Sequence, residues 1–178
     1  KNYGIEDAYI RFLNPLLEKS RILWQTGSLT RAQEQFVRNI VRQILIFEDT
    51  LLKSSTGKTG PSVAMINTSV NLPDNNFLFY KYMLKKRGYD VIFTGGVLPA
   101  SEVIEIHKLK TFDYLVVNSS AFDFARKKIG YFSSIGKSLL IKRIILTDYP
   151  EQSEKALPDN ILITRTPSEF RKIIATLR

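Results

Sequence analysis

The chain has no cysteine and only one histidine, His107, among 178 residues. Without cysteine it forms no disulfide and offers no thiolate as nucleophile or metal ligand. A single histidine excludes a metal site that needs two of them, and a Ser-His-Asp triad anywhere away from residue 107. His107 falls on a predicted helix, where we expect a solvated or helix-end side chain rather than a ligand.

The sequence also lacks any apolar run long enough to span a membrane. We therefore expect a soluble, cytoplasmic protein with no membrane partner. The chain begins at Lys1 without a cleavable apolar signal, so we expect the numbering to start inside a longer parent protein. Hydrophobic residues make up 44% of the chain, which suits one compact unit or two small packed ones.

The net charge is +9, with basic clusters at Lys81/85/86/Arg87, Arg126–Lys128 and Lys142–Arg143. Clustered cations favour direct binding of nucleic acid through counterion release. The clusters lack the interleaved aromatics of a single-strand binder and the recognition-helix pattern of a duplex reader. We therefore interpret them as the solvated surface of a mildly basic protein.

Residues 1–56 form a predicted helical cap. Apolar residues recur at three- and four-residue intervals from Tyr9 to Trp24, and Asn14-Pro15 predicts a break or kink in that run. A turn at 27–30, with Ser28 or Thr30 as N-cap, should lead into a second long helix. Its expected packing face contains Ala32, Phe36, Ile40, Ile44 and Ile46.

Residues 57–61 form a predicted linker, and 62–178 a predicted α/β domain. Strands are expected at 62–67, 90–93, 114–117, 143–146 and 160–163, and helices at 75–87, 100–109 and 168–177. The fold class is therefore α/β, a helical-bundle cap followed by a flavodoxin/Rossmann-like five-stranded parallel sheet. Such sheets bind ligands at the carboxyl ends of their strands, here the loops 67–75, 94–99, 118–122 and 147–153.

The order of motifs resembles the cobalamin-binding module, in particular the form that ends MerR-type transcription regulators. In the cap, Trp24 and Glu34-Gln35 are spaced as Trp and Glu-His are in that family, and Leu84–Val91 and Pro99–Glu102 match its second βα unit. The resemblance implies that Trp24 packs over the corrin, that Glu34 lines the same cavity, and that Ser119 bonds the nucleotide tail. A core aromatic at 24 and an exposed carboxylate at 34 are the alternatives.

The departures from the family pattern concern the lower face of the cofactor. Pro73 occupies the place of the cobalt-ligating histidine, and Asn76 that of the motif glycine. Gln35 replaces the histidine of the cap, and Thr147-Asp148 replace paired glycines after the fourth strand. A side chain at 76 opposes close backbone approach, and a carboxylate at 148 would repel the phosphate-bearing tail. We therefore expect no cofactor and no metal, with cobalamin kept as the candidate ligand.

The resemblance implies a ligand-sensing or oligomerising C-terminal module of a MerR-type regulator that is not an enzyme. Its partners would be further copies of itself, a small-molecule effector, and DNA through a winged-helix domain before Lys1. The leading alternative is a genuine cobalamin sensor or corrinoid carrier without a protein ligand to cobalt. A third is an enzyme subunit or scaffold. Asp74, Ser119, Asp123 and Asp148 lie near the expected site, but adjacent acids after the first strand and a lysine after the fifth are absent, which disfavours phosphotransfer.

Overall fold

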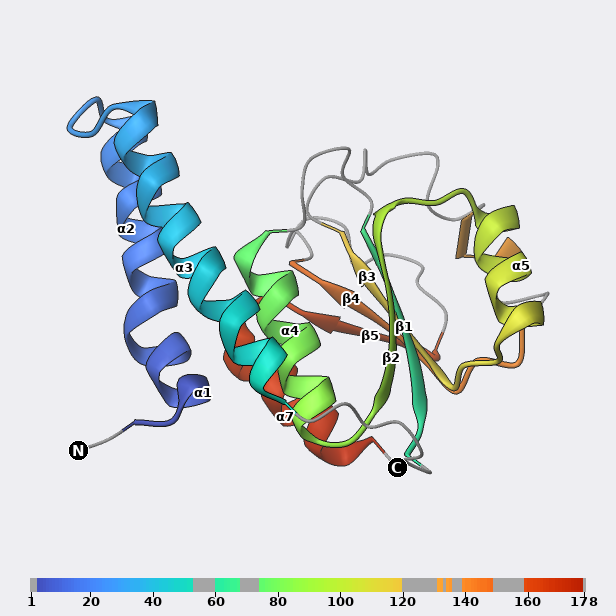
Figure 1. Ribbon diagram of the computed structural model, residues 1–178. Helices are drawn as coiled ribbons and strands as arrows, with labels where there is room; N and C mark the ends of the chain where they lie inside the picture. The colour runs from blue at the N-terminus through green and yellow to red at the C-terminus, as the bar shows by residue number, and fades with distance from the viewer. Residues whose placement is uncertain are drawn as a thin grey trace.

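A helical hairpin packs beside an α/β domain in the computed structural model, which describes residues 3–52, 60–67, 74–119, 131–132, 134–135, 139–148 and 159–177 (Figure 1). The hairpin contains α1 (Ile5–Ala8), the π-helical turn η1 (Tyr9–Leu13), α2 (Asn14–Gln25) and α3 (Arg31–Leu51). Thr30 caps α3 as predicted, because its hydroxyl accepts from the Gln33 backbone while the Gln33 side chain accepts from the Thr30 backbone.

Of the break or kink predicted at Asn14-Pro15, the break is wrong, whereas a change of helix type does occur there, since α2 begins at Asn14 after η1. Helical backbone continues from Ile5 to Gln25, and η1 supplies a wider turn immediately before the proline. Pro15 therefore falls in the first turn of α2, where its missing N–H is tolerated.

The packing face predicted for the second helix is also wrong. The buried side chains of α3 are Glu34, Val41 and Leu45, on the side that packs against α4 (Asn75–Lys86). Phe36 is 67% exposed, and Ile40, Ile44 and Ile46 are exposed as well. The helix has apolar residues on two sides, and periodicity alone does not tell which side meets the domain.

The five strands form one parallel sheet in the order β2-β1-β3-β4-β5, which confirms the predicted fold class. Their bounds are β1 Ser62–Asn67, β2 Asp90–Val97, β3 Tyr114–Asn118, β4 Arg143–Thr147 and β5 Ile161–Thr164. β2 runs past its predicted end at 93, because a register shift opposite Met65 and Asn67 lets it continue through Gly95 and pair Val97 with Asn67.

The two faces of the sheet bury alternate strand residues against different helices. Val63, Met65 and Val116 belong to a core shared with α4, α7 (Pro167–Thr176) and the hairpin. Ala64 and Leu115 belong to a second core that includes Val103 of α5 (Ala100–Leu109). In Figure 1, α5 accordingly lies across the sheet from α4 and α7. Of the helices that the structure describes, none is long and apolar enough to cross a membrane.

Position 60, just before β1, should require a glycine, because the backbone there passes close to the backbone of Gly88. A Cβ at this position would meet the backbone carbonyl oxygen of Gly88, so Gly60→Ala should lower the free energy of unfolding by about 1–3 kcal/mol in a urea titration. Gly96→Ala is the matched control, because a Cβ there meets nothing within 4 Å. Equal midpoints for the two variants would contradict the close approach.

Candidate functional site

Polar side chains gather where the strand order reverses, between β1 and β3. Asn67 and Asn118 end these neighbouring strands, and the Asn118 amide nitrogen lies 3.3 Å from both Asn67 Oδ1 and Asp74 Oδ2. Asp74 is the N-cap of α4 and accepts from the Phe77 backbone N–H at 2.7 Å. The carboxylate is thus held at a helix N-terminus, directly over the carboxyl edge of the sheet.

A chain of hydrogen bonds joins the hairpin to this edge. The Tyr9 hydroxyl donates to Asn76 Oδ1 at 2.8 Å, and Asn76 Nδ2 donates to Asp148 Oδ1 at 3.3 Å. Tyr9 is fully buried and comes from η1, whereas Asn76 lies in the first turn of α4 and Asp148 follows β4. The two partners fix which end of the Asn76 amide is oxygen.

A pocket of about 380 Å³ opens between the hairpin and this edge. Its lining consists of Asn14, Leu17, Glu18 and Arg21 from α2, Arg38 from α3, Asp74, Asn75 and Asn76 around the start of α4, and Asp148 and Arg165 after β4 and β5. Its volume is within the range of small-molecule sites. Because both parts of the protein contribute, a molecule bound there would contact the hairpin and the sheet together.

The two aspartates of the pocket, Asp74 and Asp148, are electrostatically unusual. Burial, together with the nearby Asp74 carboxylate, raises the pKa of Asp148 to about 7, against the opposing hydrogen bond from Asn76. Burial likewise raises the pKa of Asp74, although the bonds from the Phe77 backbone and Asn118 favour its charged form. Two buried carboxyl groups this close tend to share a proton near neutral pH.

The structure brings four of the sequence-predicted residues to this edge. Asn76 and Asp148 line the pocket, and Ser119 and Thr147 lie buried beside it. The Ser119 hydroxyl donates to the Thr147 carbonyl oxygen at 2.6 Å, so these two positions contact each other. Pro73 lies outside the described residues.

Three predicted site residues of the cap do not line the pocket. Trp24 is 41% exposed beside the α2–α3 turn, so it is neither in the core nor in the pocket lining. Gln35 is exposed. Glu34 is not the exposed carboxylate of the alternative interpretation, because it is 2% exposed and accepts from Arg38 Nη2 at 2.6 Å. Arg38, not Glu34, then reaches the pocket.

His107 is a helix-end residue, as predicted. It lies in the last turn of α5, where its Nδ1 accepts from the Phe112 backbone N–H at 3.3 Å and its ring meets the Phe112 ring edge-to-face. Both contacts are with the segment that follows α5, away from the pocket lining.

Sequence reasoning missed Tyr9, Arg38, Asn67 and Asn118 as parts of the site. Asn67 and Asn118 had a usable signal, since each is a polar residue that ends a predicted hydrophobic strand. Tyr9 and Arg38 had none, because their place depends on how the hairpin packs on α4.

Comparison with known proteins shows the fold. No family model and no curated protein matches the chain. Among solved structures, it is similar to the monomethylamine corrinoid protein of Methanosarcina barkeri, with a TM-score of 0.74, 11% identity, and coverage of 97% of this chain and 83% of that one. The chain therefore has the fold of a cobalamin-binding domain, and at this identity the likeness reaches no further.

Two other similar structures have TM-scores below 0.5 and carry no argument. One is the methanol:cobalamin methyltransferase complex MtaBC of Methanosarcina barkeri, at 0.47 and 16% identity, covering 96% of this chain and 69% of that one. The other is a cobalamin-binding protein from Desulfitobacterium hafniense DCB-2, at 0.48 and 13% identity, covering 92% and 89%.

Asp148→Asn should flatten the dependence of stability on pH between 5 and 8. With a pKa of about 7 in the folded protein and an ordinary value of 3.8, Asp148 keeps a proton in the native state that the unfolded state has released. Native stability from this group is therefore largest at the acid end and falls as pH rises to 7. Urea titrations should show the wild type losing about 1–3 kcal/mol more than the variant across this range.

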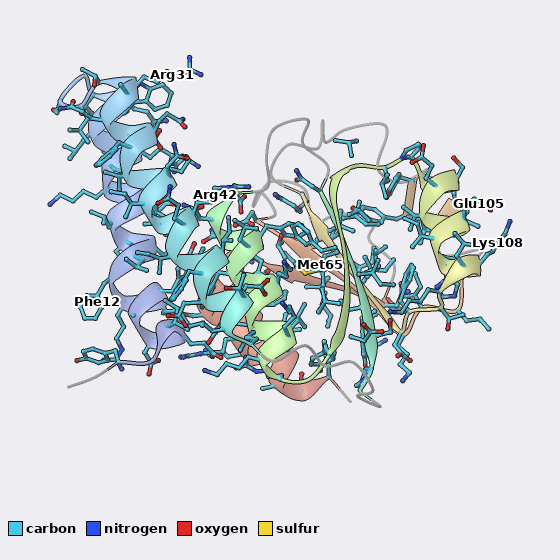
Figure 2. All side chains as sticks on the ribbon, viewed as in Figure 1. Phe12, Arg31, Arg42, Met65, Glu105 and Lys108 are labelled. Atoms are coloured by element: carbon cyan, nitrogen blue, oxygen red, sulfur yellow. The ribbon has the colours of Figure 1, made fainter. Side chains whose placement is uncertain are left out.

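The control is Glu105→Gln, which removes a carboxylate from an exposed pair with Lys108 on α5, away from the pocket (Figure 2). That variant should keep the wild-type pH dependence. A wild-type stability that rises relative to Asp148→Asn from pH 5 to 8 would refute the assigned direction.

Proposed function

We propose that this chain is the ligand-sensing and oligomerising module of a MerR-type transcription regulator, on a cobalamin-binding fold whose pocket takes a small polar molecule. The observation that carries this proposal is the pocket between hairpin and sheet. Among the ten lining residues that the structure describes, Leu17 is the one apolar residue. Its volume of about 380 Å³ lies at the low end for ligand sites, whereas a corrinoid is large and has broad apolar faces.

The residues at the family's cofactor positions do not fit an inserted corrinoid tail. Ser119 is bonded to the Thr147 carbonyl, and the Asn76 side chain is bonded on both sides, to Tyr9 and Asp148. A tail entering here would have to break buried hydrogen bonds, each of which costs free energy when left unmade. We therefore propose that cobalt takes no histidine ligand from this chain and that no step of its function passes through cobalamin.

Sensing would work by a shift between populations. α2 and α3 contribute Glu18, Arg21 and Arg38 to the pocket, and the sheet side contributes Asp74 and Asp148. A ligand that contacts both sides favours one position of the hairpin, in proportion to its differential affinity for the two positions. The hairpin is thus the element through which ligand binding would change assembly.

The exposed side of α3 supports an oligomerising role. Phe36, Ile40, Phe47 and Leu51 follow helical spacing along one side of α3 and are 67%, 42%, 61% and 60% exposed. Figure 2 shows Phe12 likewise pointing outward from the hairpin. A contiguous apolar strip of this kind is typical of a protein–protein interface. In the proposed regulator, DNA contact belongs to a separate domain of the parent protein, and assembly of this module sets the geometry of that domain.

The alternative is a corrinoid carrier or sensor without a protein ligand to cobalt. The fold likeness to the monomethylamine corrinoid protein supports it. The two proposals differ in whether the purified chain retains a corrinoid, which one experiment decides.

The chain should not retain cobalamin. After incubation with methylcobalamin or hydroxocobalamin in the dark and gel filtration, we expect no visible corrinoid absorbance in the protein peak. The bonded side chains of Asn76 and Asp148 stand where the resembled family has glycines, and they would oppose entry of the tail. Far-UV circular dichroism of the same fraction checks that the protein is folded. Retention of one corrinoid per chain would establish the alternative.

Self-association should depend on the apolar side of α3. Phe47→Ser replaces a 61% exposed ring in the middle of the strip and should reduce the mass measured by sedimentation equilibrium at a given concentration. Leu109→Ser, at an 88% exposed position on α5, is the matched control and should leave the mass unchanged. A monomeric wild type, or equal effects of the two substitutions, would argue against this interface.

A further inference from the structure

The buried end of the pocket offers acceptors that lack donors. Asn75 is 3% exposed, and its Nδ2 donates to the Arg38 carbonyl oxygen at 3.0 Å, which fixes the amide. Its Oδ1 is buried and has no hydrogen-bond partner among the described residues, and the same is true of Asp148 Oδ2. Both residues line the pocket. Unpaired buried acceptors are costly, and a bound donor would relieve that cost.

Three arginines line the pocket, Arg21, Arg38 and Arg165, and the first two are engaged with carboxylates. Arg21 pairs with Glu18 at 3.0 Å, with both side chains 51% exposed. Arg38 is 37% exposed and bonds Glu34 through both Nε and Nη2. The more buried side of the lining therefore combines Asn75 with Asp74 and Asp148, whereas Arg21 and Arg165 are exposed and mark the mouth of the pocket.

We propose that the pocket binds a small molecule through a primary ammonium group, held by Asp148, Asp74 and Asn75 Oδ1. This rests on the proposed function, since it names the ligand class of the same pocket. An ammonium has three donors and no acceptor, and so complements the unpaired Asn75 Oδ1 and Asp148 Oδ2. Asp74, whose oxygens already accept from Phe77 and Asn118, would add its negative charge. Its charge also compensates two carboxylates that burial and mutual repulsion otherwise destabilise. A carboxylate on the same molecule would face Arg21 and Arg165 at the mouth.

Two other occupants fit less well. An anion at the buried end would meet two carboxyl groups and no unpaired donor. A divalent metal ion prefers a larger set of acidic ligands or room for several waters. Within the described residues, no group of three or more histidine, cysteine, aspartate or glutamate side chains could hold one.

Isothermal titration calorimetry of the purified chain at pH 7.5 tests the proposal with four probes: propylammonium, L-alanine, propionate and magnesium chloride. We expect a heat of binding from propylammonium or from L-alanine. If L-alanine binds and propylammonium does not, recognition also requires the carboxylate that faces the arginines at the mouth. Asp148→Asn should weaken that binding at least about tenfold, equivalent to about 1.4 kcal/mol. Glu105→Gln, at a 64% exposed pair on α5, should leave it unchanged.

The pH dependence of wild-type binding is a second measurement that needs no variant. Affinity for propylammonium should rise up to about tenfold from pH 6 to pH 8, as the proton held by the acidic pair leaves. The charged and titratable groups around Asp148 are Asp74, Glu18, Arg38, Arg165, Tyr9 and Tyr80. Burial raises the pKa of both tyrosines, so neither titrates in this range.

The ammonium proposal would be overturned if propionate or magnesium bound and neither amine did, or if neither amine gave a heat of binding. It would also be overturned if the Asp148→Asn variant bound the amines as tightly as the wild type. These outcomes leave the proposed small-ligand function standing. Retention of cobalamin in gel filtration is the separate result that would remove it.

Discussion

The hydrogen-bond chain from Tyr9 through Asn76 to Asp148 is the contact on which the site depends. It joins the hairpin, α4 and the end of β4 through one amide, whose oxygen and nitrogen are both engaged. In a buried setting each of these bonds is strong, and losing one partner leaves the others unsatisfied. The same amide holds Oδ1 of Asp148 and leaves Oδ2 for the pocket. Hairpin position and pocket chemistry are therefore set together.

Asp148 has a backbone conformation that glycine adopts most readily. Its φ is 55°, in the left-handed region that most residues avoid and aspartate tolerates better than most. A glycine here would leave open space, whereas the carboxylate bonds Asn76 and faces Asp74. A side chain at this position therefore adds a carboxyl group to the pocket at little backbone cost.

The fold could be predicted because its patterns are local. The strands of the sheet carry apolar runs bounded by turn residues, and their parallel order follows from the alternation with helices. Asn76 and Asp148 could be placed from their distance to strand ends. Tyr9 could not, because its approach to Asn76 depends on the packing of η1 and α3 on α4. The outward side of α3 was unpredictable for the same reason, since Phe36 and Val41 are both apolar and only the tertiary contact separates them.

The net charge of the chain does not indicate the charge of its pocket. The chain carries +9, which would suggest an anionic partner. Yet its deeper pocket residues are Asp74, Asp148 and Asn75, and two of the three arginines that line the pocket already hold carboxylates. Surface charges are screened by water and salt within about 10 Å, whereas buried carboxyl groups act at close range in a low dielectric. The charge that a pocket of this kind favours therefore depends on its buried oxygens more than on the net charge of the chain.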